Sequence, residues 1–290
     1  MANINIQTFE EGDQAVLYDR RSREYLVYLE KSNTFESHLG NLDHCKIIGK
    51  PEGSWIPTST GHLFLAFKPT RFQYTLNMPR VATIVYPKDI GAIITYSNIS
   101  NGDIVVEAGS GSGSLTINLS EIVGEEGHVY SYDIRSDMSG TAESNLRKFS
   151  PNYKNVTFKI GDVSETLFEQ NVDAVILDLP EPWHSVDSSA KALKFGGTFL
   201  SFLPNVSQVS DLVEEIKKHP EFSLINTVEI IERSWDVSGR TMRPSHKMIG
   251  HTGFITTARK CTQRPRSCLL YTSDAADDTP CVDLGGRRII

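Results

Sequence analysis

Four acidic residues end or directly follow short apolar runs that are typical of buried strands. Glu107 ends IVVE, Asp133 ends HVYSYD, Asp162 follows VTFKIG, and Asp178 follows VDAVIL. In open α/β sheets, ligands bind outside the carboxyl ends of the strands. Acids gathered at that edge favour a ligand that carries positive charge.

The first of these acids precedes a glycine-rich loop. Gly109, Gly111 and Gly113 are spaced GxGxG between the strand and a helix. Glycines let the backbone approach a ligand closely, and the free N–H groups of a helix start attract an anion. Dinucleotide dehydrogenases prefer GxGxxG, and Glu107 would repel a pyrophosphate. The pattern favours S-adenosylmethionine over NAD, while a turn that only packs strand on helix stays open for this motif alone.

The next two acids fit other parts of the same cofactor. Asp133 lies about 20 residues beyond the glycines, where an acid accepts hydrogen bonds from both ribose hydroxyls. Asp162 is placed to bind the amino group of the adenine, with the backbone N–H of Val163 beside it. Either acid alone is equally consistent with a solvated loop, but acids at the ends of successive strands strengthen the prediction.

Several segments together resemble the tRNA adenine-N1 methyltransferases that modify adenine 58 of the T-loop, particularly the archaeal members. They are YPKDIGAII, VVEAGSGSGSL, LDLPEPW and RPSHKMIGHTGF, and HLGNLDHCKIIGKPEG resembles the archaeal N-terminal β domain. The likeness covers residues from about 8 to 260. It implies an α/β fold of the class I S-adenosylmethionine-dependent methyltransferases, Rossmann-like with a seven-stranded sheet. It also implies tRNA as substrate and a homotetramer, and some archaeal relatives modify adenine 57 as well.

The resemblance also implies roles for individual residues. The substrate-facing acid falls on Asp178, which is also expected to contact the cofactor, and the motif tyrosine falls on Tyr86; these are the candidate catalytic residues. The ribose acid falls on Asp133, where the family more usually has Glu, and the adenine contacts fall on Asp162 and Val163. The cofactor-binding residues of the loop are Glu107, Gly109, Ser110, Gly111, Ser112, Gly113, Ser114 and Leu115.

Asp178 then has a definite chemical task. Adenine N1 has a free lone pair, so its methylation needs no base, but the ring becomes cationic. A carboxylate near N1 and the N6 amino group accepts an N6–H hydrogen bond and stabilises the developing charge. Trp183 and Tyr86 are equally consistent with stacking on the base and with packing.

Three other functions compete with this one. An NAD-dependent dehydrogenase is disfavoured by the glycine spacing. A non-catalytic tRNA-binding subunit is disfavoured because the glycine loop and Asp178 are intact. A methyltransferase that acts on another substrate, such as a corrin, shares the glycine loop but not LDLPEPW or the N-terminal segment.

The elements that must position these residues fall into two parts. Residues 1–70 alternate short β-rich runs with turns, which predicts a small N-terminal β domain. Residues 71–264 alternate helical and strand patterns, which predicts a parallel sheet with helices on both faces and the catalytic domain. Residues 265–290 lack periodicity and resemble translated sequencing adapter, so we expect a non-native tail. Gly140 interrupts a predicted helix.

Composition and charge narrow the function further. The net charge of −7 argues against indiscriminate nucleic-acid coating, although a local basic patch can still hold RNA. Phosphate-binding candidates are Arg71, Arg80, Lys88, Arg240, Arg243 and Lys247. No membrane span or signal peptide is predicted, so we expect a cytoplasmic protein. The cysteines form no CxxC pair, and neither they nor His246 and His251 predict a metal site.

Overall fold

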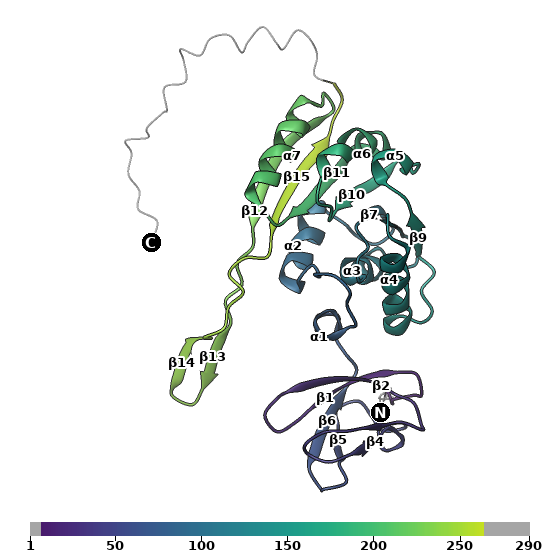
Figure 1. Cartoon of the computed structure of the whole chain (residues 1–290), viewed down its shortest axis with the longest axis vertical. Coiled ribbons are helices and arrows are strands. Elements are labelled where there is room, and N and C mark those ends of the chain that lie inside the picture. The colour runs from purple at the N-terminus through teal and green to yellow at the C-terminus, as the bar shows by residue number, and fades with distance from the viewer. Residues whose placement is uncertain (1–6, 264–290) are drawn as a thin grey trace, which may run out of the picture.

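The computed structural model describes residues 7–263, and the predicted tail lies outside the described residues. Figure 1 shows a small sheet near the N-terminus and a larger sheet covered by helices, with α1 between them. No helix within residues 7–263 is long and apolar enough to cross a membrane.

The small sheet is antiparallel and has the strand order β2-β1-β6-β5. Its strands are β1 (Gln14–Tyr18), β2 (Glu24–Tyr28), β5 (Ser54–Pro57) and β6 (Leu63–Phe67), and β3 (Thr34–Phe35), β4 (Leu42–Asp43) and the 3-10 turn η1 (His44–Lys46) lie between β2 and β5. One face buries Leu17 and Phe64 in a core of its own. The antiparallel β structure predicted for this segment is confirmed.

The large sheet has seven strands in the order β12-β15-β11-β10-β7-β8-β9. Its strands are β7 (Ile104–Ala108), β8 (His128–Asp133), β9 (Val156–Ile160), β10 (Val172–Leu177), β11 (Leu193–Leu203), β12 (Phe222–Glu229) and β15 (Phe254–Lys260). The five strands from β11 to β9 are parallel, but β15 is antiparallel to both of its neighbours. The prediction of a parallel sheet is wrong there, because the chain returns from β12 without a crossover helix.

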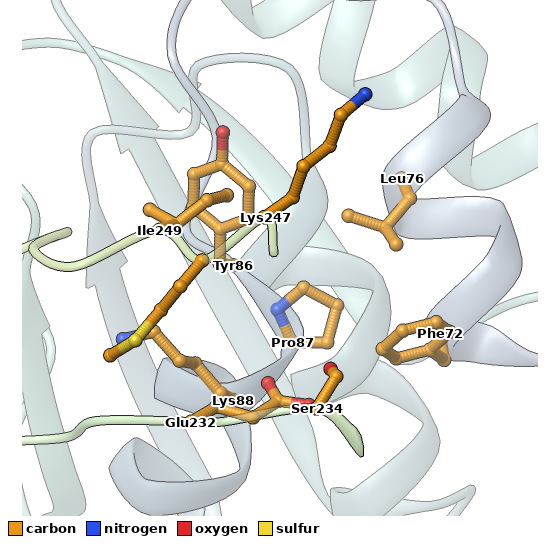
Figure 2. Close-up of a pocket in the computed structure, with 10 residues that line it drawn as sticks. Phe72, Leu76, Tyr86, Pro87, Lys88, Glu232, Ser234, Lys247 and Ile249 are labelled. Atoms are coloured by element: carbon orange, nitrogen blue, oxygen red, sulfur yellow. The ribbon is translucent and has the colours of Figure 1, made fainter. Parts of the chain in front are cut away.

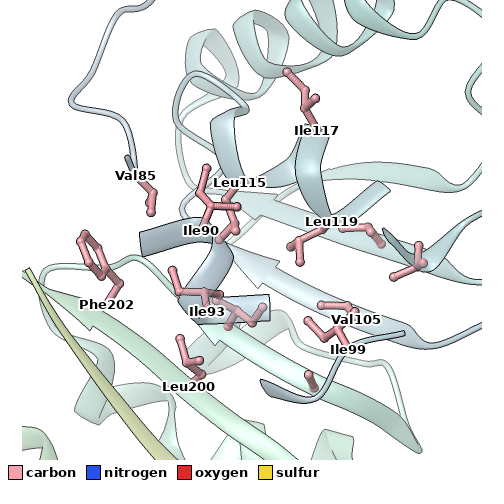
Figure 3. Close-up of a cluster of buried hydrophobic side chains, with 14 of the residues drawn as sticks. Val85, Ile90, Ile93, Ile99, Val105, Leu115, Ile117, Leu119, Leu200 and Phe202 are labelled. Carbon is pink, nitrogen blue, oxygen red and sulfur yellow. The ribbon is translucent and has the colours of Figure 1, made fainter. Parts of the chain in front are cut away.

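Helices cover both faces of the large sheet, as predicted. They are α2 (Pro87–Ser97), α3 (Ser114–Val123) and α4 (Ser136–Phe149) on one face, and α5 (Val163–Thr166), α6 (Val186–Ala192) and α7 (Val206–Lys218) on the other, with α1 (Arg71–Asn77) and the 3-10 turn η2 (Pro182–Ser185) as connections. Strand residues alternate between the two cores: Val105 belongs to the core that contains Ile93 (Figure 3), whereas Val106 belongs to the core that contains Leu212. Glu107 is two residues after Val105, so its side chain faces α3.

A hairpin projects from the large sheet. It consists of β13 (Trp235–Ser238) and β14 (Thr241–Pro244), and Figure 1 shows it reaching away from the body. We call residues 230–253, which join β12 to β15, the arm.

Candidate functional site

The glycine loop connects β7 to α3, and its backbone conformation requires glycine. Gly109 has φ +92°, and a Cβ there would lie 2.2 Å from the carbonyl oxygen of Asp178. Gly113, the N-cap of α3, has φ +83°, and a Cβ there would lie 3.0 Å from the Cα of Ala142. Because β7 and β10 are neighbouring parallel strands, the loop and Asp178 meet at the same sheet edge. The loop is therefore fixed against the segment that carries Asp178.

Glu107 is fully buried beneath the first turn of α3. Its Oε2 accepts hydrogen bonds from the Thr116 hydroxyl at 2.6 Å and the Ser131 hydroxyl at 2.7 Å. Within the described residues its Oε1 has no partner. Burial, helped by the nearby charges of Asp178 and Asp133, raises the pKa of Glu107 to about 7 against the lowering effect of the two hydroxyls.

Asp178 directly follows β10, and its backbone N–H donates to the carbonyl oxygen of Ala108 at 2.8 Å. Its side chain is half-buried, and burial raises its pKa to about 7. No hydrogen bond to its carboxylate is found in the described part of the chain. Two carboxyl groups, those of Asp178 and Glu107, thus lie at neighbouring strand ends, and neither is paired with a cation from residues 7–263, so this edge favours a positively charged ligand.

A cavity of about 220 Å³ opens beside these strand ends. The ends of β7, β8 and β9 and the loop after β10 line it with Ala108, Gly109, Tyr132, Asp133, Ile134, Gly161, Asp162, Val163, Ser164, Leu179, Pro180, Glu181, His184 and Ser185. Four of the predicted site residues, Gly109, Asp133, Asp162 and Val163, therefore share one cavity. Its lining contains no Lys or Arg.

The acids of this cavity also hold the local backbone. Asp133 Oδ2 accepts from the Gly111 backbone N–H at 3.1 Å, and its Oδ1 accepts from that of Arg135 at 2.9 Å. Asp162 caps α5 by accepting from the backbone N–H of Ser164 at 2.8 Å. Asp133 thereby links the end of β8 to the glycine loop.

Tyr86 lies in a different place from Asp133 and Asp162. It is the N-cap residue of α2 and lines a second cavity of about 200 Å³, which shares no lining residue with the first. Figure 2 shows this second cavity between Phe72 and Leu76 of α1, the start of α2, and the arm, which contributes Glu232, Ser234, Lys247 and Ile249. The Trp183 ring packs against the core beneath α6 and α7, so packing outweighs stacking for this residue.

Lys88 is not an exposed phosphate-binding residue. Its side chain is 9% exposed, and its Nζ contacts Asp89 Oδ1 at 2.7 Å, the Ile230 carbonyl at 2.8 Å and the Thr252 hydroxyl at 2.6 Å. The prediction for Lys88 is wrong because the fold uses this ammonium to tie α2 to both ends of the arm.

Other predicted cations also differ in their contacts. Arg80 donates to the carbonyl oxygen of Leu76 at 3.0 Å, and Arg243 contacts Nε2 of His246 at 2.5 Å. His251, which is not one of the predicted phosphate contacts, bridges Glu229 and the Pro204 carbonyl. Arg71 and Arg240 are exposed. Among the described residues, no group of three or more His, Cys, Asp or Glu side chains is arranged to hold a metal.

Sequence reasoning missed the hydroxyl groups beneath the glycine loop. Thr116 and Ser131 are buried and contact Glu107, and the hydroxyl of Ser110, a predicted loop residue, lies 2.7 Å from that of Ser131. Serine and threonine are too common for their positions to single them out. Only the strand register, which pairs Glu107 with Ser131, reveals the contact.

Two sequence-family models match this chain, one over the segment of the small sheet and one over most of the segment of the large sheet. The sequence model of the family described as "tRNA methyltransferase complex GCD14 subunit" matches residues 61–245, and the "TrmI-like N-terminal" model matches residues 8–56. Among curated proteins, the tRNA (adenine(57)-N(1)/adenine(58)-N(1))-methyltransferase TrmI of Methanocaldococcus jannaschii is 40% identical over 84% of this chain and 94% of its own. The tRNA (adenine(58)-N(1))-methyltransferase TrmI of Thermus thermophilus is 37% identical over 84% and 96%.

Solved structures give the same picture. A SAM-dependent O-methyltransferase from Thermotoga maritima matches with a TM-score of 0.85 and 34% identity, covering 89% of this chain and 96% of that chain. The tRNA (m1A58) methyltransferase TrmI of Aquifex aeolicus matches with a TM-score of 0.78 and 30% identity, covering 89% and 100%. The seven-stranded sheet with its small N-terminal β domain is that of the class I methyltransferases.

Proposed function

The chain belongs to the tRNA methyltransferase family of the GCD14 subunit, and we propose that it methylates N1 of adenine 58 in the T-loop of tRNA with S-adenosylmethionine as donor. The observation that carries this proposal is Asp178, a half-buried carboxylate without a hydrogen-bond partner in the described part, fixed against the glycine loop at Gly109. The name of the Methanocaldococcus relative extends the proposal to adenine 57.

The residues at the strand ends fit S-adenosylmethionine. The donor supplies an electrophilic methyl group on a positively charged sulfonium. Glu107, buried beneath the glycine loop, supplies negative charge that suits its ammonium, and the start of α3 suits its carboxylate. Asp133 and Asp162, which line one cavity, suit the ribose and the adenine amino group, with Val163 beside them. Ser110, Gly111, Ser112, Gly113, Ser114 and Leu115 complete the cradle in this proposal.

Asp178 acts by orienting and stabilising the target base. Its carboxylate accepts a hydrogen bond from the adenine N6 amino group and faces N1 as the ring gains positive charge. Pro180 and Pro182 restrict the loop after Asp178, which reduces the entropy lost when the base enters. The reaction needs no proton acceptor at N1, so Asp178 serves as an electrostatic group rather than a base.

Access to N1 requires the T-loop to open and the base to leave its stack. We place Tyr86 beside the entering nucleotides, because its cavity lies between α1, α2 and the arm. The candidate phosphate contacts are Arg71, Arg80, Arg240, Arg243 and Lys247, all of which are exposed. The two sheets serve, in this proposal, as an N-terminal domain (1–70) and a catalytic domain (71–264) of a cytoplasmic enzyme.

The affinity for S-adenosylmethionine is expected to fall as the pH drops below about 7. Glu107 has a pKa of about 7, and only its ionised form attracts the ammonium of the donor. The Glu107 carboxyl group is charged above this pH and becomes protonated below it, so Kd rises by up to about tenfold per pH unit as the pH falls below about 7. Isothermal titration calorimetry between pH 5.5 and 8.5 measures this. A Kd that stays constant over this range contradicts the prediction.

The arm supports a homotetramer in this proposal. Its side chains Trp235, Val237 and Met242 are 59%, 70% and 72% exposed, which is unusual for large apolar residues of one hairpin. A second copy of the chain is the occupant we propose for this surface, because an isolated two-stranded hairpin is at best marginally stable.

Replacing Trp235, Val237 and Met242 together with serine is expected to convert the tetramer to smaller species. Light scattering coupled to size-exclusion chromatography measures the mass. The matched control is Val206→Ser, which removes a 69% exposed apolar side chain from α7 and should leave the mass unchanged. An unchanged mass of the triple variant argues against the arm as the interface.

The function is tested with purified chain, unmodified tRNA and labelled S-adenosylmethionine. Digestion and mass spectrometry should identify 1-methyladenosine, formed without a second protein. A chain that binds tRNA but no S-adenosylmethionine would instead be a non-catalytic subunit. An O-methylated nucleoside, or any product other than 1-methyladenosine, would refute the substrate.

A further inference from the structure

We infer that Thr116 and Ser131 are positioning residues, whose hydroxyls hold Glu107 as an ionised carboxylate beneath the glycine loop, where its charge attracts the ammonium group of the donor's amino acid. The inference rests on the proposed function, since it needs S-adenosylmethionine at this edge of the sheet. It assigns a role to two residues that no sequence motif marks.

The fold places both hydroxyls on one oxygen. Glu107 and Ser131 are register partners on neighbouring strands, so their side chains lie on the same face, beneath α3. Thr116 is in the first turn of α3 and points down onto this face. Its hydroxyl lies 2.6 Å from Glu107 Oε2, and the Ser131 hydroxyl lies 2.7 Å from the same atom. One carboxylate oxygen thus takes both bonds, and the other takes none within the described residues.

The directions of the hydrogen bonds follow from counting protons. A hydroxyl donates once. Since Ser131 donates to Glu107, the 2.7 Å contact between Ser110 and Ser131 must have Ser110 as the donor. Thr116 and Ser131 therefore donate to Glu107, and Ser110 of the glycine loop donates to Ser131. The arrangement stabilises an ionised carboxylate and links its orientation to the loop.

The charges around Glu107 select the ligand. Asp178 after β10 and Asp133 at the end of β8 are the charged groups that act on it, and both are negative. The neighbouring cavity is lined by no Lys or Arg that could pair with these acids. Because Glu107 is fully buried, its charge acts on the donor across the glycine loop, and the primary ammonium is the group of the donor's amino acid that a negative charge attracts.

Thr116→Val tests the inference, because it removes the hydroxyl and keeps the shape of the side chain. We expect Kd to rise about tenfold for both S-adenosylmethionine and S-adenosylhomocysteine, since both carry the ammonium. Thr116→Ser, which restores the donor, should return both values to within about twofold of the unsubstituted chain. The matched control is Thr256→Val, because Thr256 is also fully buried and its hydroxyl contacts only Thr227, at 3.0 Å, among the contacts described.

The pH dependence separates positioning from a merely structural role. The Thr116 hydroxyl lowers the pKa of Glu107, so its loss should move the midpoint of the binding curve to higher pH. A structural role would weaken binding equally at every pH.

Each outcome has a definite meaning. Unchanged affinities of Thr116→Val overturn the inference and leave the proposed function intact. Weaker binding of S-adenosylmethionine alone would place the contact at the sulfonium and overturn the ammonium assignment. If the unsubstituted chain binds neither ligand, the proposed function itself fails.

Discussion

Replacing Asp178 with alanine is expected to lower kcat for tRNA methylation by about 10²–10³-fold, the usual effect of removing one preorganised electrostatic group. The carboxylate is half-buried and lies against the glycine loop, so it acts where water screens little. The affinity for S-adenosylmethionine should change much less. The charge of Asp178 raises the pKa of Glu107, so its removal leaves Glu107 more ionised at neutral pH.

Single-turnover kinetics and titration calorimetry measure the two effects separately. Glu181→Ala is the matched control, since Glu181 lies three residues further in the same loop with its side chain 65% exposed. Its kcat should stay within about threefold, because an exposed charge interacts weakly through water. Asp178→Asn retains a hydrogen-bond acceptor without the charge, so its kcat should lie between those of Asp178→Ala and Glu181→Ala. Full activity of Asp178→Ala would remove the electrostatic role from the mechanism.

The gathering of the candidate site residues at one sheet edge was predictable because it depends on strand ends. Each parallel strand is a short apolar run, and the residue after it must lie at the carboxyl edge of the sheet. Glu107, Asp133, Asp162 and Asp178 were found in this way, and the structure brings them to one edge. The glycine spacing was equally informative, because positive φ at Gly109 and Gly113 is a local requirement of the backbone.

Other features depend on contacts between distant segments, which spacing does not reveal. Lysine is usually found at the surface, yet the Lys88 side chain is buried. Its ammonium contacts Ile230 and Thr252, which are more than 140 positions away in the sequence. β15 is antiparallel to β12 because the arm folds back and brings the chain into the sheet in the opposite direction. The sequence of the arm did not predict this reversal. The contacts of Thr116 and Ser131 with Glu107 can be recognised only from the strand register and from the position of α3 over Glu107.

Gly109→Ala is expected to weaken S-adenosylmethionine binding by at least about 100-fold and to destabilise the protein by roughly 2–4 kcal/mol, because two costs combine. The alanine would have to adopt the φ of +92° that Gly109 has, which L residues rarely do. Its Cβ would also lie 2.2 Å from the Asp178 carbonyl oxygen, a backbone atom that cannot rotate away. Calorimetric titration and thermal unfolding measure the two effects.

The control for this substitution is Gly140→Ala, at a helical glycine in α4 with no atom within 4 Å of the added Cβ. It should stabilise the protein by up to about 1 kcal/mol and leave binding unchanged. Because Gly109 abuts Asp178, its substitution must shift the Asp178 carboxylate together with the loop, so kcat and affinity should fall together. Asp178→Ala, in contrast, should lower kcat alone. If Gly109→Ala binds the donor within about threefold of the unsubstituted chain, the close contact between loop and carboxylate segment has no part in forming the site.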